Sequence, residues 1–325
     1  MQRRPIALTM GDPAGIGPEI TAKAWTQIRQ EVPLVFVGDP ACLQDLGIPV
    51  RAYAPGDPIT DQALSVIPVP LAQSARPGIA APENASATIK SIETAVALTQ
   101  AGDTAAVVTN PITKRILVDG AGFAHPGHTE FLAALDGVAS SVMMLACAEL
   151  RVVPVTIHIP LMDVATTLTP ALLTDVITIT ETALRTQFGI PAPRIAVAGL
   201  NPHAGEGGMM GGEELAFITP ALDVLRAGGM DIRGPLPADT MFHAAARDAY
   251  DVAICMYHDQ ALIPIKTLGF DQGVNITLGL SFIRTSPDHG TAYDIAGRGL
   301  AKPDSLIAAI RMADEMSATK PWSPQ

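Results

Sequence analysis

The chain has 325 residues, of which 48% are hydrophobic and only 4% aromatic, so it is long enough for two domains with mainly aliphatic cores. Its formal net charge of -11 argues against a nucleic-acid partner, because phosphates would be repelled over most of the surface. The apolar run at residues 6–10 is shorter than the ~7–15 residues of a signal-peptide core, and no run reaches the ~18 residues of a membrane span. The three cysteines lack CxxC spacing, which is typical of a reducing compartment, so we expect a cytoplasmic protein without a membrane partner.

Short runs rich in Val and Ile alternate with helical patterns along the chain. The predicted strands lie at residues 5–9, 34–37, 105–108, 152–157, 194–198 and 252–256. The predicted helices lie at residues 83–101, 129–135, 170–188, 213–227 and 303–316. Continuous apolar strands that alternate with helices indicate an α/β fold with mostly parallel sheets. The Pro- and Ala-rich stretch 57–82 is interpreted as a connection.

Three predicted strands run directly into a histidine. VVPVTIHIP contains His158, IAVAGLNPH ends in His203, and VAICMYHDQ contains His258. Open α/β sheets bind ligands beyond the carboxyl ends of their strands, so three strand ends can bring three imidazoles together. For any one of these histidines, a hydrogen-bonded role at a strand end is about as good an interpretation as a role in metal binding. As a set they favour a catalytic three-histidine metal site, for which zinc, cobalt or nickel is suited.

Two glycine-rich segments are candidate ligand loops. In MGDPAGIGPEI, Gly15 and Gly17 permit a tight turn before a helix whose N-terminus can hold an anion. The segment is not a GxGxxG dinucleotide fingerprint, because Ile20 stands where the third glycine is required. The second segment, SPDHGTAYDIAGRGLAKPDS, permits close approach of a flat ligand such as adenine, although composition alone favours a simple helix cap and loop.

Charged and polar residues near these motifs suggest an anionic substrate. Three basic residues lie near the motifs: Lys114, Lys266 and Arg284. Each of them alone is interpreted as a solvated surface charge, but together they could bind a phosphate or carboxylate. Asp239 and Asp259 are each a candidate general base or a partner of a ligand histidine, and Asp239 equally fits a helix cap. The HPGHTEFLA turn contains His128 and Thr129. It fits either the start of a helix or a contact with the substrate.

The ordered motifs resemble those of the 4-hydroxythreonine-4-phosphate dehydrogenase family. MGDPAGIGPEI, HPGHTEFLA, LNPHAGEGGMMGGEE, GPLPADTMF, YHDQALIPIK and GVNITLGLSFIRTSPDHGTAYDIAGRG follow one another from residue 5 to about residue 305. The resemblance implies the two-domain α/β fold of isocitrate and isopropylmalate dehydrogenases, with the active site in the interdomain cleft. It suggests one domain at residues 1–125 plus 290–325, with dinucleotide contacts, and a metal, substrate and dimerisation domain at residues 126–289.

The resemblance also assigns site residues. It implies a homodimer in which His158, His203 and His258 from two subunits hold one zinc, cobalt or magnesium ion, although imidazole ligands argue against magnesium. The implied substrate contacts are His128, Thr129, Lys266, Asn275 and Arg284. NAD or NADP would contact Gly15, Gly17, His289, Gly290, Thr291, Ala292 and Asp294. The catalytic candidates are Asp239, Asp259 and Lys266.

The implied reaction belongs to pyridoxal 5'-phosphate (vitamin B6) biosynthesis. It is the metal-assisted oxidation of 4-hydroxy-L-threonine 4-phosphate at C3, followed by decarboxylation to 3-amino-2-oxopropyl phosphate. Related dehydrogenases that act on threonate or erythronate 4-phosphate or on a cis-dihydrodiol acid are the first alternative. A phosphate acyltransferase or a non-enzymatic metal- or phosphate-binding protein is the more remote one. Asn110, in TNPITK, replaces a glycine or alanine of many relatives, so the role of this turn is left open.

Overall fold

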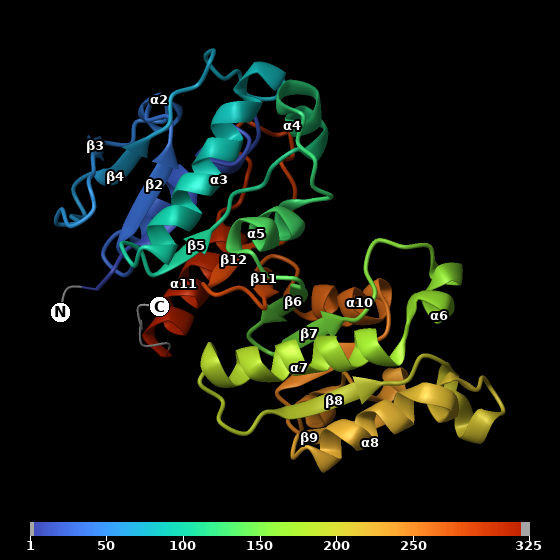
Figure 1. Cartoon of the computed structure of the whole chain (residues 1–325). Coiled ribbons are helices and arrows are strands. Elements are labelled where there is room, and N and C mark those ends of the chain that lie inside the picture. Colours follow the sequence, from blue (N-terminus) through green and yellow to red (C-terminus); the bar gives the residue numbers. More distant parts are fainter. Residues whose placement is uncertain (1–2, 320–325) are drawn as a thin grey trace. The chain divides into compact units, whose positions relative to one another are not determined.

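The chain forms two compact units in the computed structural model, which describes residues 3–319 (Figure 1). One unit comprises Met1–Ser141 with Leu280–Gln325, and the other comprises Val142–Gly279. The domain boundaries predicted from the sequence lie earlier, at 125/126, and later, at 289/290. In the structure, helix α5 (His128–Asp136) packs on helix α3 (Ala85–Gln100) of the first unit. The Asp136 carboxylate accepts a 2.6 Å hydrogen bond from the Ser281 amide. These contacts join both flanking segments to the first unit.

The first unit is built on a parallel sheet with the strand order β3-β4-β2-β1-β5-β12. Its strands are β1 (Ile6–Thr9), β2 (Leu34–Gly38), β3 (Val50–Ala52), β4 (Leu64–Pro68), β5 (Ala106–Val108) and β12 (Arg284–Pro287). Besides α5, its helices are α1 (Gly17–Ile28), α2 (Ala41–Gln44), α3 (Ala85–Gln100), α4 (Lys114–Ala121) and α11 (Asp304–Thr319), with a 3-10 turn η1 (Pro82–Asn84). Helix α3 packs on β1 and β2, and α11 packs on β5 and β12.

The second unit has a mixed sheet with the strand order β11-β6-β7-β10-β8-β9. The pairs β11–β6 and β6–β7 are antiparallel, whereas β7–β10, β10–β8 and β8–β9 are parallel. Its strands are β6 (Val142–Cys147), β7 (Leu150–Pro154), β8 (Arg194–Ala198), β9 (Asp231–Leu236), β10 (Val252–Cys255) and β11 (Val274–Leu278). Its main helices are α6 (Val164–Thr167), α7 (Pro170–Thr186), α8 (Thr219–Ala227), α9 (Ala244–Arg247) and α10 (His258–Gly269).

Four short segments complete the second unit. They are the 3-10 turns η2 (Leu161–Asp163), η3 (Pro202–Gly208) and η5 (Ala238–Thr240) and the π-helical turn η4 (Glu214–Ile218). Two of them lie in functional motifs, because η3 carries His203 and η5 carries Asp239. The parallel strands β7, β10 and β8 are adjacent, so the chain after each of them starts from the same edge of the sheet.

The α/β class with mostly parallel pairing is confirmed, and all six predicted strands form within a few residues of the expected positions. The interpretation of residues 57–82 as a connection was wrong, because this stretch contains β4, which pairs with both β2 and β3. Its alternation is hard to recognise, since three buried residues are followed by a half-buried one and then by the exposed Pro68. The cores are aliphatic as expected: the fully buried large side chains include Ile6, Leu8 and Ile20.

No single helix among residues 3–319 is long and apolar enough to cross a membrane. Leu161–Thr167 and Pro170–Thr186 meet the length and composition criteria only when taken together, and the two helices are bent by 91° at the break between them.

Candidate functional site

Two of the three predicted metal-binding histidines lie close together in the second unit. The ring centroids of His158 and His258 are 5.8 Å apart, and their rings are inclined by 45°. His158 follows β7, and His258 is the first residue of α10, after the adjacent strand β10. Two imidazoles on one zinc ion have ring centroids roughly 5 Å apart, given Zn–N distances of about 2.0–2.1 Å. This pair therefore fits two ligands of one divalent ion.

His203 has the expected strand-end position but does not complete that pair. It lies in η3, after β8, and is exposed. Among residues 3–319, no group of three or more His, Cys, Asp or Glu side chains is arranged to hold a metal ion. His158 and His203 both have left-handed backbone conformations, with φ of 52° and 53°. Such strain in a residue other than glycine is often found where function requires a particular geometry.

The two candidate acids differ in what they contact. The Asp259 carboxylate lies 2.7 Å from Nδ1 of His258, which leaves Nε2 of that ring available to bind a metal ion. Asp239 is exposed in η5, and its side chain does not cap that turn. The nearby helix α9 is instead capped by His243, whose Nδ1 accepts a 3.4 Å hydrogen bond from the Ala246 amide. The helix-cap interpretation of Asp239 was therefore wrong, and its carboxylate faces solvent.

A cavity of about 290 Å³ adjoins the His158–His258 pair. The two histidines and Asp259 supply its polar character. Its other lining residues are mainly apolar: Thr156, Ile157, Ile159, Leu161, Val164 and Tyr257. The cavity therefore combines imidazole and carboxylate groups with a largely apolar wall, as small-molecule sites usually do.

A buried cationic site forms in the first unit around Arg284. Arg284 lies in β12 and is 3% exposed, and its guanidinium donates a 2.6 Å hydrogen bond to Oγ1 of Thr109. Burial lowers the pKa of Arg284 to about 10, so it stays charged at neutral pH. Burial, and then the charge of Arg284, hold the pKa of His128 well below its usual value of 6.5. His128 is therefore a neutral imidazole beside a buried cation, and its Nε2 has no hydrogen-bond partner among the described residues.

The other predicted substrate residues fall in both units. Thr129 follows His128 in α5 and is half-buried. Lys266, in α10, places its ammonium 5.4 Å from the ring centroid of Phe270. Asn275 lies in β11, and its Oδ1 is buried without a hydrogen-bond partner in the part of the chain that the structure describes. Lys114 begins α4 and is exposed, as expected of an ordinary surface charge.

The two glycine-rich loops meet in the first unit. The Ile16 amide donates a 2.9 Å hydrogen bond to the carbonyl of Thr291, and a Cβ on Gly15 would lie 2.9 Å from that oxygen. A Cβ on Gly17 would lie 3.0 Å from the Met10 carbonyl. The loops need small residues because their backbones are in contact. Ala292 adopts a φ of 41°, and the exposed residues of this predicted cofactor set are His289, Gly290 and Asp294.

A polar cluster that sequence reasoning missed links the same two loops. The Tyr293 hydroxyl donates to the buried Asp12 carboxylate and lies 2.8 Å from Oγ1 of Thr113. Thr113 in turn lies 3.0 Å from Oγ1 of Thr291. Burial and the contact with Asp12 raise the pKa of Tyr293, so it remains a neutral donor. Asp12, Thr291 and Tyr293 stand in the two loop motifs and Thr113 stands in TNPITK, but nothing in the sequence indicated that these side chains pair.

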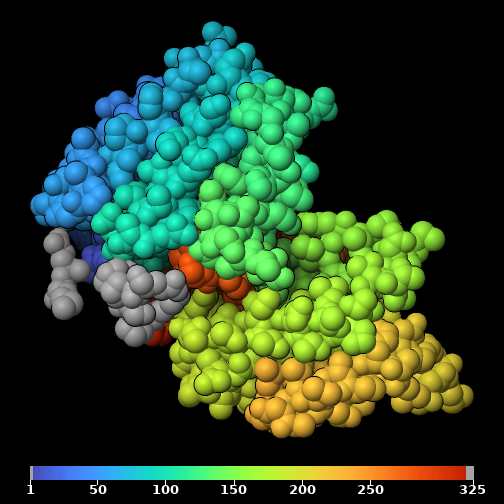
Figure 2. Space-filling model, in the orientation of Figure 1, coloured from blue at the N-terminus to red at the C-terminus, as the bar shows by residue number. Residues whose placement is uncertain are grey.

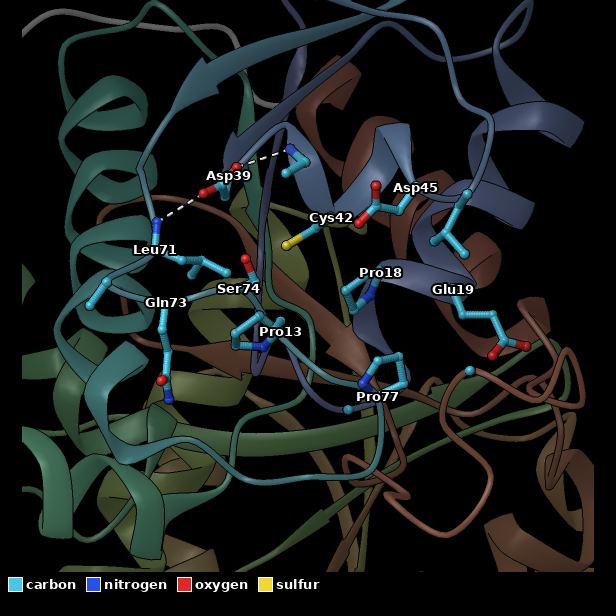
Figure 3. Close-up of a pocket in the computed structure, with 16 residues that line it drawn as sticks. Pro13, Pro18, Glu19, Asp39, Cys42, Asp45, Leu71, Gln73, Ser74 and Pro77 are labelled. Atoms are coloured by element: carbon cyan, nitrogen blue, oxygen red, sulfur yellow. Dashed lines mark hydrogen bonds between the residues drawn. The ribbon is translucent and has the colours of Figure 1, made fainter.

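A larger cavity of about 380 Å³ opens beside Gly15 (Figure 3). Its polar wall includes the carboxylates of Glu19, Asp39 and Asp45. Asp39 is fixed in place, since its two carboxylate oxygens accept 2.9 Å hydrogen bonds from the amides of Ala41 and Leu71. Neither lysine nor arginine is among the described residues that line this cavity. It is therefore suited to a neutral or hydroxyl-rich group rather than to a phosphate.

The structure also gives Asn110 a role. Its Nδ2 donates to the Thr9 carbonyl at 2.9 Å and to Oγ1 of Thr21 at 2.8 Å. The side chain lies against Gly11 and Gly17, where an added Cβ would approach it within 2.6 and 3.4 Å. Asn110 therefore joins β1, β5 and α1, and the turn that was left open in the sequence is structural.

Comparison with known proteins identifies close relatives. The family model for the pyridoxal phosphate biosynthetic protein PdxA matches residues 29–313. A 4-hydroxythreonine-4-phosphate dehydrogenase from Ruegeria sp. (strain TM1040) is 59% identical, over 97% of each chain. The structure of the Klebsiella pneumoniae 4-hydroxythreonine-4-phosphate dehydrogenase has 40% identity and a TM-score of 0.89, and covers 97% of this chain and 99% of that one. A terephthalate 1,2-cis-dihydrodiol dehydrogenase from Burkholderia xenovorans has 29% identity and a TM-score of 0.69, and covers 97% and 98%.

Proposed function

The chain belongs to the PdxA family and is a dehydrogenase, and we propose that it oxidises 4-hydroxy-L-threonine 4-phosphate at C3 with a nicotinamide dinucleotide. The oxidised product then loses carbon dioxide and gives 3-amino-2-oxopropyl phosphate, a step of pyridoxal 5'-phosphate biosynthesis. The observation that carries this proposal is the 59% identity to the Ruegeria enzyme over 97% of both chains. Each unit supplies side chains that support it: the second unit brings two imidazoles together, which a metal-assisted reaction needs, and the first unit holds a buried arginine, which suits an anionic substrate.

We propose His158, His203 and His258 as the ligands of one divalent ion. The 5.8 Å separation of two of the rings and the contact of Asp259 with Nδ1 of His258 support this assignment. Imidazole donors favour zinc or cobalt over magnesium, which prefers oxygen ligands. A divalent ion bound here supplies Lewis-acid chemistry that lowers the pKa of the substrate hydroxyl.

Side chains of this protein would remove the proton of the substrate hydroxyl and later protonate the enolate. Asp239 is the preferred general base, because Asp259 is already engaged with His258 and is better suited to orient that ring. A dinucleotide held by the two glycine-rich loops would supply the acceptor for the hydride that leaves C3. In the second step the bond between the carboxylate and the neighbouring carbon breaks, carbon dioxide leaves, and the electron pair forms an enolate. Lys266 is the proposed donor of the proton that this enolate takes up.

Arg284, His128, Thr129, Lys266 and Asn275 are the proposed substrate contacts. Arg284 is a cation buried in β12, and its guanidinium is held by Oγ1 of Thr109 at 2.6 Å. A phosphate or carboxylate oxygen would bind this cation through charge-assisted hydrogen bonds. The neutral His128 could bind the same anion through Nε2 as a donor, without adding a second buried charge.

The cofactor is proposed to bind along Gly15, Gly17, His289, Gly290, Thr291, Ala292 and Asp294. The 380 Å³ cavity beside Gly15 is large enough for part of a nucleoside. Its carboxylates Asp39 and Asp45 would repel a 2'-phosphate, whereas Glu19 is paired with Lys23 at 2.8 Å. We therefore expect NAD to be preferred over NADP. Calorimetric titration of the protein with each dinucleotide measures this preference directly, and equal affinities would remove the cavity from the cofactor site.

We propose that the enzyme acts as a cytoplasmic homodimer that shares its metal sites. In the second unit, Leu161, Met162 and Met209 are 71, 85 and 86% exposed, and they lie near His158 and His203 in sequence. The yellow to gold part of the chain, which carries the His203 loop, lies at the surface in Figure 2. A second copy would cover these apolar side chains and bring the third imidazole. The three free cysteines are consistent with a reducing compartment.

The test is NADH formation from 4-hydroxy-L-threonine 4-phosphate and NAD, followed by absorbance in metal-depleted protein before and after zinc or cobalt is added. We expect no turnover in the metal-depleted protein and turnover once zinc or cobalt is added. A protein that binds NAD and metal but turns over only a cis-dihydrodiol acid, or threonate or erythronate 4-phosphate, would instead have the specificity of a related dehydrogenase. The 29% identity to the dihydrodiol dehydrogenase makes that substrate class the first alternative to assay.

A further inference from the structure

The loop that carries His203 has an unusual backbone. The five residues His203, Ala204, Gly205, Glu206 and Gly207 all have left-handed φ values, of 53, 52, 77, 41 and 67°. Three of these are not glycine, and residues with a Cβ avoid this region because the Cβ approaches the following carbonyl. Surrounding contacts must therefore hold the loop in this conformation.

A buried carboxylate closes the start of the loop. Glu214 is 3% exposed, and its Oε1 accepts a 2.8 Å hydrogen bond from the Asn201 amide. Its Oε2 accepts a second bond of 2.9 Å from Nδ2 of Asn201. The Asn201 carbonyl then accepts a 3.0 Å bond from the Ala204 amide, across His203. Both carboxylate oxygens therefore fix a residue that lies two positions before the histidine.

The side chains of Asn201 and Glu214 occupy space beside three glycines, where a Cβ atom would clash with them. A Cβ on Gly199 would lie 3.1 Å from Oε1 of Glu214, and one on Gly205 would lie 2.6 Å from Oε2. A Cβ on Gly211 would lie 2.3 Å from Nδ2 of Asn201. The Asn201–Glu214 pair is therefore enclosed by positions that cannot accept a larger residue without a shift, and the loop is built around it.

A second side chain ties the same loop to the strand that leads to His258. Pairing of β8 with β10 ends at Val197 and Ile254. Beyond that point Nε2 of Gln260 donates a 2.9 Å hydrogen bond to the Gly199 carbonyl, and its Oε1 accepts a 2.7 Å bond from the Met256 amide. Gln260 therefore continues the connection between the two segments after the strand ladder has stopped.

We propose that Asn201, Glu214 and Gln260 form a positioning network that fixes the backbone from which His203 binds a metal ion. The inference rests on the proposed metal site, because it concerns one of its three ligands. None of the three side chains needs to touch the ion: they act through the peptide groups at residues 199, 201 and 256. Without the network, the left-handed loop relaxes toward ordinary backbone angles, and the imidazole moves away from the position of a ligand.

Two variants and a matched control test the network. Glu214→Gln places an amide donor against Nδ2 of Asn201, and Gln260→Met keeps the length of the side chain but removes both hydrogen bonds. Glu213→Gln is the control, because Glu213 accepts a 2.8 Å bond from Nδ2 of Asn201 that the oxygen of glutamine still accepts. Zinc affinity is measured by competition with a chromophoric chelator, and the ligand set is measured from the visible absorption spectrum of the cobalt-loaded protein. His203→Ala provides the reference for a lost ligand.

The expected result is a fall in zinc affinity of about tenfold to a hundredfold in Glu214→Gln and Gln260→Met, the usual range for residues that orient ligands. Their cobalt spectra should shift toward that of His203→Ala, whereas Glu213→Gln should match the wild type. Unchanged zinc affinity and an unchanged cobalt spectrum in Gln260→Met would overturn the network, even if Glu214→Gln failed to fold. If His203→Ala itself kept full zinc affinity, the proposed metal site would be wrong, and this result is distinct from failure of the network alone.

Discussion

The proposed anion site around Arg284 and the proposed metal site around His158 differ in how complete they are within one chain. Arg284 is buried in a strand of the first unit, where Thr109 fixes its guanidinium, and His128 is half-buried at the start of a helix of the same unit. His158 and His203, in contrast, are exposed on strained loops, and only one pair of imidazoles is brought together. The first site is preorganised by packing, whereas the second needs an ion and a further ligand to become a defined structure.

The largest expected effect comes from breaking the proposed metal site. His158→Ala should lower turnover and metal content by at least ~100-fold, because two imidazoles hold a catalytic ion far less tightly than three. Metal analysis after gel filtration and the rate of NADH formation measure the two quantities. His243→Ala, which removes only the cap of α9, is the matched control and should keep its metal. Retention of metal in His158→Ala would exclude this residue from the site.

The anion site should respond in KM rather than in metal content. Arg284→Ala should weaken substrate binding by about 2–3 kcal/mol, or roughly 30- to 150-fold in KM, because a charge-assisted contact is lost. Lys114→Ala removes an exposed cation of the same unit and should leave KM unchanged. Steady-state kinetics with the phosphorylated substrate compare the two variants. An unchanged KM in Arg284→Ala would show that the buried guanidinium does not bind substrate.

The lowered pKa of His128 should make stability depend on pH. Its lowered pKa means that the folded protein binds this proton more weakly than the unfolded chain does. As the pH falls below about 6.5, the unfolded state is protonated first, and the free energy of unfolding decreases by at most about 1.4 kcal/mol per pH unit from this group. Urea denaturation of the wild type and of His128→Gln at several pH values measures the difference. Parallel pH profiles would mean that the folded protein does not lower the pKa of His128.

A small structural effect is expected at Asn110. Asn110→Ala removes the hydrogen bonds to Thr9 and Thr21 and should lower the free energy of unfolding by about 1–2 kcal/mol. Asn110→Asp should cost more, because it places an acceptor against the Thr9 carbonyl. Urea denaturation at neutral pH measures both values. A fully stable Asn110→Asp would contradict the assignment of Nδ2 as the donor.

The contrast between the two sites also explains what the sequence could predict. The strand-end positions of His158, His203 and His258 follow from the rule that parallel strands present their carboxyl ends at one edge, and the structure places all three after adjacent strands. The sequence could not predict that Glu214 pairs with Asn201, or that Gln260 bonds the peptide groups of Gly199 and Met256. Such contacts depend on which buried polar groups meet after folding, and they have no periodicity. The same holds for Arg284, whose burial beside Thr109 depends on the pairing of β12 with β5.

Subunit mixing tests the central claim most directly. His203→Ala and His258→Ala are each expected to be inactive, and the two proteins are unfolded together and refolded as a mixture. If two copies share each metal site, half of the dimers are mixed, and each mixed dimer contains one intact set of three histidines, so about a quarter of the wild-type activity returns. If each site lies within one chain, every site in the mixture lacks a ligand. No recovery of activity, in a mixture that refolds to stable dimers, would contradict the shared site.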